Sequence, residues 1–155
     1  MPIVINNTLN QIRSIAAGSD DRTAKAKRLS ELVQKLGDYR WVGIYDVGAE
    51  LVSIIGWTGE STPEYPSFPV TEGLTGAAIQ EKRAVIVGDV RSDPRYLTAF
   101  GSTVSEIIVP VFSPADGRVI GTVDVESERA NAFSASDQQM IEHCVEAALP
   151  IWLLQ

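Results

Sequence analysis

The chain has 155 residues, of which 45% are hydrophobic and 21% are charged. This length and composition are typical of a single globular domain, here 1–155, that buries its own core without crosslinks. The formal net charge of −7 opposes binding to nucleic acid or to an anionic membrane surface.

The cysteine and histidine content excludes several kinds of site. Cys144 is the only cysteine and His143 is the only histidine, so an intramolecular disulfide and a thiolate or multi-histidine metal cluster are excluded. We expect no metal and no cofactor. The N-terminal residues lack the features of a signal peptide, and no stretch is apolar enough for a membrane span, so we expect a cytoplasmic protein.

The spacing of apolar residues in 1–37 predicts two helices. Gly18 and Gly37 are predicted to end them. Asp20 and Asp21 favour the start of the second helix, because the N-terminal end of a helix is partially positive. The apolar residues that recur on one face of each helix are Ile5, Leu9 and Ile12, then Leu29, Leu32, Val33 and Leu36.

From residue 38 the pattern changes to short runs rich in β-branched residues. Five strands are predicted, at 40–47, 51–57, 84–87, 106–112 and 119–126. The short connections at 48–50 and 113–117 predict antiparallel hairpins. The stretches 58–83 and 88–105 are rich in Gly, Pro, Ser and Thr, so we expect loops with short helices that shape a binding site over one sheet face.

A last helix is predicted at 134–150. Its start, Ser-Ala-Ser-Asp at 134–137, is typical of a capping box, and Pro150 disturbs its end. Cys144 falls on the apolar stripe, where a buried and inert thiol is expected. The domain therefore divides into N-terminal helices at 1–37, the sheet and pocket loops at 38–133, and the C-terminal helix at 134–150.

Residues 72–78, EGLTGAA, read as a loop that turns into a helix with Thr75 in its first turn. The first N–H groups of a helix have no partner within it and carry partial positive charge, so the side chain of Thr75 is well placed to contact a ligand. Arg83, Arg91 and Arg95 are alternatives for binding an anion, although simple solvation is the expectation.

This order of elements resembles that of the GAF domain family over residues 25–150. The segments that match in order are Gly-Leu-Thr-Gly-Ala-Ala at 73–78, Val-Arg-Ser-Asp-Pro-Arg at 90–95, Ile-Ile-Val-Pro-Val at 107–111, Val-Ile-Gly-Thr-Val-Asp at 119–124 and Phe-Ser-Ala-Ser-Asp at 133–137. The resemblance implies an α+β fold with a GAF-like central antiparallel sheet. The N- and C-terminal helices would pack on one face, and long loops would form a pocket on the other.

Within that family the chain is most similar to the free methionine-R-sulfoxide reductases. The matching strand segments are Trp-Val-Gly-Ile-Tyr at 41–45, Ser-Glu-Ile-Ile-Val-Pro at 105–110 and Val-Asp-Val-Glu-Ser at 123–127. In those reductases an aromatic pair and carboxylates surround the substrate. The resemblance therefore implies ligand-binding roles for Trp41, Tyr45, Glu106, Asp124 and Glu126, the last of which stands where aspartate is usual.

The cysteines of those reductases are missing. At the matching positions this chain has Tyr65, Thr75 and Ala99. None of these side chains forms a sulfenic acid or a disulfide, and a threonine hydroxyl without a nearby base is a poor nucleophile. We expect a retained pocket without the redox chemistry, and we predict no catalytic residue.

The same residues can be interpreted without the resemblance. Side chains alternate along a strand, so Asp124 and Glu126 share one face. With Glu106 on the adjoining strand they suit a cationic group such as an ammonium; alternatively, they are simply solvated acids at a strand end. Trp41 and Tyr45 also share a face, either as one wall of a pocket or as part of the core.

Three functions remain open on these grounds. The leading hypothesis is a stand-alone module that binds a small amino-acid-like or other polar metabolite, does no redox chemistry and signals through a partner or self-association. The alternatives are a reductase that acts through Cys144 or another mechanism, and a structural dimerisation module. A homodimer is expected because the helices at 5–17 and 138–149 and the apolar C-terminal residues offer much apolar surface. Those C-terminal residues are Ile151, Trp152, Leu153 and Leu154.

Overall fold

The computed structural model describes residues 3–97 and 101–153. The helices are α1 (Ile3–Ala17), α2 (Arg22–Gly37), α3 (Gly73–Glu81), α4 (Ala135–Ala148) and α5 (Pro150–Leu153), with a 3-10 turn at Val90–Ser92. The strands are β1 (Trp41–Val47), β2 (Leu51–Thr58), β3 (Ser67–Pro69), β4 (Val85–Val87), β5 (Ser105–Phe112) and β6 (Val119–Ser127).

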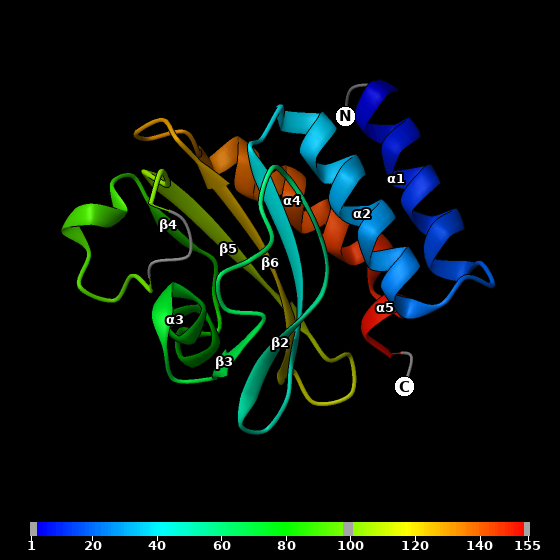
Figure 1. Ribbon diagram of the computed structural model, residues 1–155. Helices are drawn as coiled ribbons and strands as arrows, with labels where there is room; N and C mark the ends of the chain where they lie inside the picture. Colours follow the sequence, from blue (N-terminus) through cyan, green and yellow to red (C-terminus); the bar gives the residue numbers. More distant parts are fainter. Residues whose placement is uncertain (1–2, 98–100, 154–155) are drawn as a thin grey trace.

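The strands form one antiparallel sheet of 6 strands in the order β3-β2-β1-β6-β5-β4. Helices α1, α2, α4 and α5 lie on one side of this sheet, and α3 with the connecting loops lies on the other (Figure 1). The predicted α+β architecture is confirmed. Because β1 and β6 are neighbours at the centre, their side chains reach the middle of both layers.

The helix side of the sheet holds the main core. Val123 and Val125 of β6 lie there with alternate residues of β1 and β5, as the predicted strand alternation requires. The large apolar residues that are almost wholly buried in this core are Ile12, Leu29, Val33, Val42, Ile44, Ile107, Ile141 and Ile151. The opposite face carries the polar and aromatic residues of the candidate site.

Local signals explain the ends of the helices. The Asp21 side chain accepts a hydrogen bond from the Ala24 N–H at 2.8 Å, so Asp21 caps α2 as predicted. Ser134 and Asp137 form the expected capping box of α4. The end of α2 differs from the prediction, because Gly37 is still helical and Asp38 adopts the left-handed conformation that stops the helix, with φ of 52°.

One strand lies where only a loop was expected. β3, within the predicted loop 58–83, pairs with β2 and places Phe68 opposite Val52. A 3-residue strand carries too little alternation to stand out in a sequence rich in proline and serine. No helix in the described part of the chain is long and apolar enough to cross a membrane.

The terminal helices bury their apolar residues within the chain. The main core includes Leu9, Ile12, Ile151 and Trp152, and Ile5 packs against it. This corrects the reasoning behind the expected homodimer, because these residues are not a free surface. Among the described residues named for that interface, Leu153 is the exposed one, at 49%; Leu154 lies outside the described residues. The homodimer itself stays a prediction.

Candidate functional site

The aromatic side of the site comes from β1. Trp41, Gly43 and Tyr45 share the face opposite the helices, and a Cβ on Gly43 would lie 2.3 Å from the Trp41 ring. Only glycine therefore lets the indole lie across the strand. The Trp41 Nε1–H donates to the Ser61 carbonyl at 3.0 Å, so the polar tip of this buried ring is satisfied.

A bulge at Ile55 of β2 lies opposite the step from Ile44 to Tyr45. The register between β1 and β2 shifts between Ile44 and Tyr45, and such bulges re-orient side chains near sites. The Tyr45 carbonyl accepts a hydrogen bond from the Trp152 Nε1–H at 2.9 Å. Its ring makes an edge-on contact with Phe68, with centroids 5.9 Å apart.

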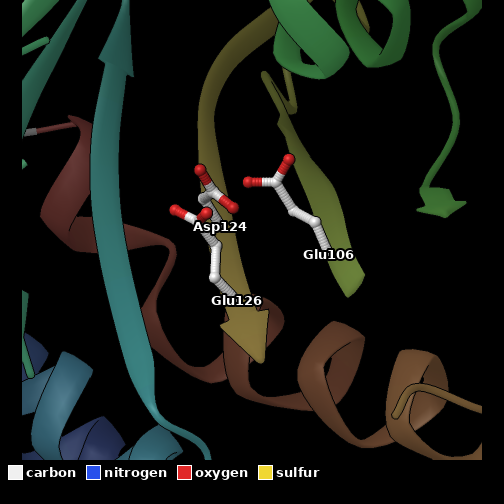
Figure 2. Close-up of side chains that lie close together, drawn as sticks. All are labelled: Glu106, Asp124 and Glu126. Carbon is white, nitrogen blue, oxygen red and sulfur yellow. The ribbon is translucent and has the colours of Figure 1, made fainter. Parts of the chain in front are cut away.

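The acidic side of the site comes from β5 and β6. Glu106 lies directly opposite Glu126 in the sheet, and Asp124 lies two residues along β6 on the same face. Figure 2 shows the carboxylates of these residues turned toward one another. One oxygen from each lies within 4.8 Å of the others. We call Glu106, Asp124 and Glu126 the carboxylate cluster.

The carboxylate cluster is buried, which contradicts the reading of Asp124 and Glu126 as solvated acids. The exposed fractions are 4% for Glu106, 7% for Asp124 and 0% for Glu126. Glu126 accepts a hydrogen bond from the Thr103 hydroxyl at 2.8 Å. Asp124 Oδ1 has no hydrogen-bond partner among the described residues. Buried carboxylate oxygens without partners are destabilising unless they are protonated or meet a cation.

Burial and mutual repulsion hold protons on the carboxylate cluster. Desolvation raises the pKa of Glu106 well above 4.5, and the neighbouring Asp124 and Glu126 raise it further. Desolvation also raises the pKa of Asp124 to about 6. The pKa of Glu126 rises to about 8 through desolvation and the charge of Asp124, against lowering contributions that include Thr103 and Arg40. A bound cation would reverse this effect, because it favours the ionised forms.

A small cavity adjoins the cluster on the α3 side. Its volume is about 30 Å³. The described residues that line it are Tyr45, Pro63, Tyr65, Phe68, Gly73, Leu74, Thr75, Leu97, Glu106, Ile108 and Asp124. No lysine, arginine or histidine is among them.

The structure brings most, though not all, of the predicted ligand-binding residues to this cavity. Tyr45, Thr75, Glu106 and Asp124 are in its wall. Trp41 and Glu126 pair with each other one step farther along the sheet and are outside the described wall. Phe68 and Leu97 also line the cavity, and the sequence does not predict either of them there. Phe68 sits on the unpredicted β3, and Leu97 comes from a loop whose position depends on tertiary packing.

Of the three positions that hold cysteine in the reductases, two are placed at the cavity. Tyr65 and Thr75 both line the cavity, and Ala99 lies outside the described residues. Cys144 is in the core on the helix side of the sheet, where burial raises the pKa of its thiol to about 12. This confirms the expected buried thiol, and a thiol with such a pKa is a poor nucleophile.

The start of α3 forms one wall of the cavity. Glu72 is the N-cap, and its side chain makes no capping hydrogen bond. Thr75 in the first turn is 4% exposed. The backbone of Thr71 packs so closely on Gly76 that a Cβ there would lie 2.7 Å from a Thr71 carbon. The turn that leads into α3 is therefore closely packed on the helix itself.

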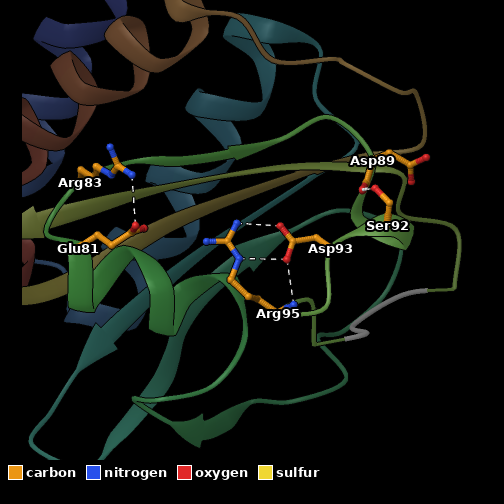
Figure 3. Close-up of polar contacts among 6 residues, drawn as sticks. All are labelled: Glu81, Arg83, Asp89, Ser92, Asp93 and Arg95. Carbon is orange, nitrogen blue, oxygen red and sulfur yellow. Dashed lines mark hydrogen bonds and ion pairs between the residues drawn. The ribbon is translucent and has the colours of Figure 1, made fainter.

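The arginines considered above for anion binding are engaged in exposed ion pairs. Arg83 lies 3.2 Å from Glu81, and Arg95 lies 2.8 Å from Asp93 (Figure 3). Arg91, in the 3-10 turn, forms an ion pair with Asp89, the residue just before that turn. Each positive charge is offset locally, so the described loops present no arginine cluster for an anionic ligand.

A larger surface groove of about 440 Å³ runs between α1 and α2. Its walls carry Asp20, Arg28, Glu31 and Lys35, whose charges are mixed, and Arg28 pairs with Asp20 at 3.6 Å. Its described walls hold no buried polar atom without a partner. The small cavity beside the carboxylate cluster is therefore the better candidate site despite its size.

The carboxylate cluster is also a possible donor set for a hard divalent cation. Calcium takes about 6–8 oxygen ligands, so most of its ligands would have to be water. The described wall of the adjoining cavity adds no further carboxylate or carboxamide oxygen. The Thr103 hydroxyl already donates to Glu126. A cation that brings its own hydrogen-bond donors fits this arrangement better than a metal ion.

Comparison with known proteins agrees with the GAF-like fold described above. The family model of the GAF domain matches residues 21–148. GAF domain-containing protein A of Dictyostelium discoideum is 25% identical over 135 residues, which are 87% of this chain and 84% of that protein. The free methionine-R-sulfoxide reductase of Saccharomyces cerevisiae is 32% identical over 108 residues, 68% of this chain and 58% of that protein. The structure of the Neisseria meningitidis free methionine-R-sulfoxide reductase in complex with its substrate superimposes with a TM-score of 0.84 at 26% identity, covering 96% of this chain and 88% of that one.

Proposed function

Because this chain belongs to the GAF domain family, we propose that it is a small-molecule binding module whose pocket holds the primary ammonium group of an amino-acid-like ligand. One observation carries the proposal. Glu106 and Asp124 are buried in the wall of a cavity, and Asp124 Oδ1 has no partner among the described residues. A ligand ammonium supplies both the charge and the hydrogen-bond donors that these oxygens lack.

The spacing of the carboxylate cluster supports an ammonium in particular. An alkylammonium has three N–H donors in tetrahedral directions, so acceptors at about 2.8 Å from its nitrogen lie about 4.6 Å apart. The cluster offers one oxygen from each of its carboxylates within 4.8 Å of the others. The aromatic rings of Tyr45 and Phe68 lie beside these oxygens in the same wall, and they suit the apolar part of such a ligand.

The proposal excludes thiol-based reduction of a sulfoxide. That reaction needs a thiolate at the substrate, and the described wall has Tyr65 and Thr75 at two of the reductase cysteine positions. Cys144 lies across the sheet in the core, with a pKa raised to about 12. The similarity to free methionine-R-sulfoxide reductases therefore supports the type of ligand, whereas the residues present argue against the reaction.

Calorimetric titration with unbranched α-amino acids tests the proposal. The series is glycine, L-alanine, L-2-aminobutyrate, L-norvaline and L-norleucine, each compared with its N-acetylated form. At least one free amino acid is expected to bind, and the acetylated forms are not, because acetylation removes the ammonium charge. Glu106→Gln should weaken binding by about 1–3 kcal/mol, the range for losing a hydrogen bond to a charged group.

Glu142→Gln is the matched control, because Glu142 is an exposed glutamate on α4 outside the cavity. It should bind as the parent does. Equal binding of acetylated and free forms, or unchanged affinity in Glu106→Gln, would contradict an ammonium site. Saturable binding of Ca²⁺ at micromolar concentration without any amine would point to a metal site instead.

A further inference from the structure

Tyr65 stands at the rim of the cavity in a position that decides how long a ligand can be. Its side chain lines the cavity, yet the residue is 39% exposed. One side of Tyr65 therefore faces the cavity, and the other faces solvent. The cavity that remains with the ring in place has a volume of about 30 Å³, and Tyr65 is the largest exposed side chain in its described wall.

Most of the remaining wall is buried and closely packed. Leu74, Thr75 and Ile108 are buried at 2%, 4% and 1% exposure. Tyr45 and Phe68 hold each other through their edge-on contact. Helix α3 is held against the sheet by a buried apolar cluster, in which its Leu74 and Ala78 pack with Val85, Val90 and Ile108. In close-packed walls of this kind, extra atoms force strained side chains or backbone shifts.

Tyr65, in contrast, is held only through its backbone. It stands between Pro63 and Pro66, and a residue before proline is restricted to extended conformations. The Pro66 carbonyl is tied to the Ile54 N–H at 2.8 Å. With the described residues, the Tyr65 side chain makes no hydrogen bond, ion pair or ring contact. The backbone of this segment is thus fixed, and the position of the ring depends on rotation of the side chain.

We infer that Tyr65 is the specificity-determining residue of the pocket, and that it restricts the ligand to short-chain primary amines by occupying the space that a longer chain would need. The inference rests on the proposed function, because it takes the ammonium to be held at Glu106 and Asp124. The ring fills one end of the site, so a ligand anchored at the carboxylates has room for a short chain only. A ligand of methionine length would require the ring to leave the rim.

The amino-acid series tests this inference on the full chain. The parent protein should bind glycine or L-alanine at least tenfold more tightly than L-norleucine, because each excess methylene in a closed pocket changes affinity by roughly tenfold or more. Tyr65→Ala should reverse the order and bind L-norleucine more tightly than L-alanine. Tyr65→Phe should keep the order of the parent, because it keeps the ring and removes only the hydroxyl.

Phe112→Ala is the matched control, since Phe112 is 41% exposed and lies outside the cavity wall. It should leave the order of affinities unchanged, and thermal melts should establish that every variant is folded. Parent affinity that is independent of chain length, or a Tyr65→Ala protein that keeps the parent order, would overturn the inference. Both outcomes leave the proposed function intact, provided that binding still needs the free ammonium; loss of that requirement would refute the proposed function instead.

Discussion

Raising the pH from 5 to 8.5 is expected to destabilise the protein when no ligand is bound. In the folded state the pKa of Asp124 is raised from 3.8 to about 6, and that of Glu126 is raised from 4.5 to about 8. The folded form therefore binds protons more tightly than the unfolded form. Its extra stability is complete below the unfolded pKa values and is lost as the pH rises through the folded ones.

The size of this loss follows from the pKa values. A tenfold change in proton affinity corresponds to about 1.4 kcal/mol. The pKa of Asp124 rises from 3.8 to about 6, a total loss of roughly 3 kcal/mol, of which about half falls above pH 5. The carboxyl groups with lowered pKa, including Asp93 and Asp137, act in the opposite direction. Their contribution is complete above the unfolded pKa of 3.8 and stays constant in this pH range.

Urea denaturation followed by tryptophan fluorescence at half-unit steps of pH measures the effect. The free energy of unfolding should fall by several kcal/mol between pH 5 and pH 8.5, on the order of the values above. Glu126→Gln should flatten the upper part of the curve, because it removes the group whose pKa is about 8. Glu142→Gln should keep the parent slope. A parent curve that is flat, or that rises with pH, would refute the buried cluster as we describe it.

Further outcomes are expected on the same grounds. The protein should not reduce free methionine sulfoxide above background in a thioredoxin-coupled NADPH assay; turnover that Cys144→Ala abolishes would place a thiol reaction on α4. Glu106→Gln should leave the melting temperature of the empty protein unchanged or raised, because the amide resembles a protonated carboxyl group, and a lower melting temperature with unaltered binding would make Glu106 structural. Amine binding at pH 7 should release protons, so its calorimetric enthalpy should vary with the ionisation enthalpy of the buffer, and equal enthalpies in two buffers would count against a protonated cluster. The protein should form a homodimer, for which a monomeric mass by light scattering at micromolar concentration is the contrary result.

Strand alternation and helix caps are the parts of this structure that the sequence predicts well. The shared face of Asp124 and Glu126 follows from their spacing alone. The capping box at Ser134 and the cap at Asp21 also depend only on neighbouring residues. Thr75 was predicted in the first turn of a helix beside the site, and it lines the cavity.

Tertiary packing decides the rest. Nothing local distinguishes Phe68 or Leu97 from other loop residues, yet the pairing of β3 with β2 and the course of the loop after the 3-10 turn bring both to the cavity. The apolar residues at the two ends of the chain suggested an interface, whereas α1 and α5 pack in one core. Apolar periodicity predicts that a face is covered and does not say by what.

The carboxyl pKa values with and without ligand test the central claim most directly. In a protein labelled with ¹³C at aspartate and glutamate carboxyl groups, NMR titration follows each member of the carboxylate cluster separately. With saturating L-alanine, the pKa of Asp124 should fall below its raised value of about 6, and that of Glu126 below about 8, because a bound ammonium favours the ionised carboxylates. If L-alanine binds and these pKa values stay where they are, the ligand is held elsewhere and the carboxylate cluster is not the ammonium site.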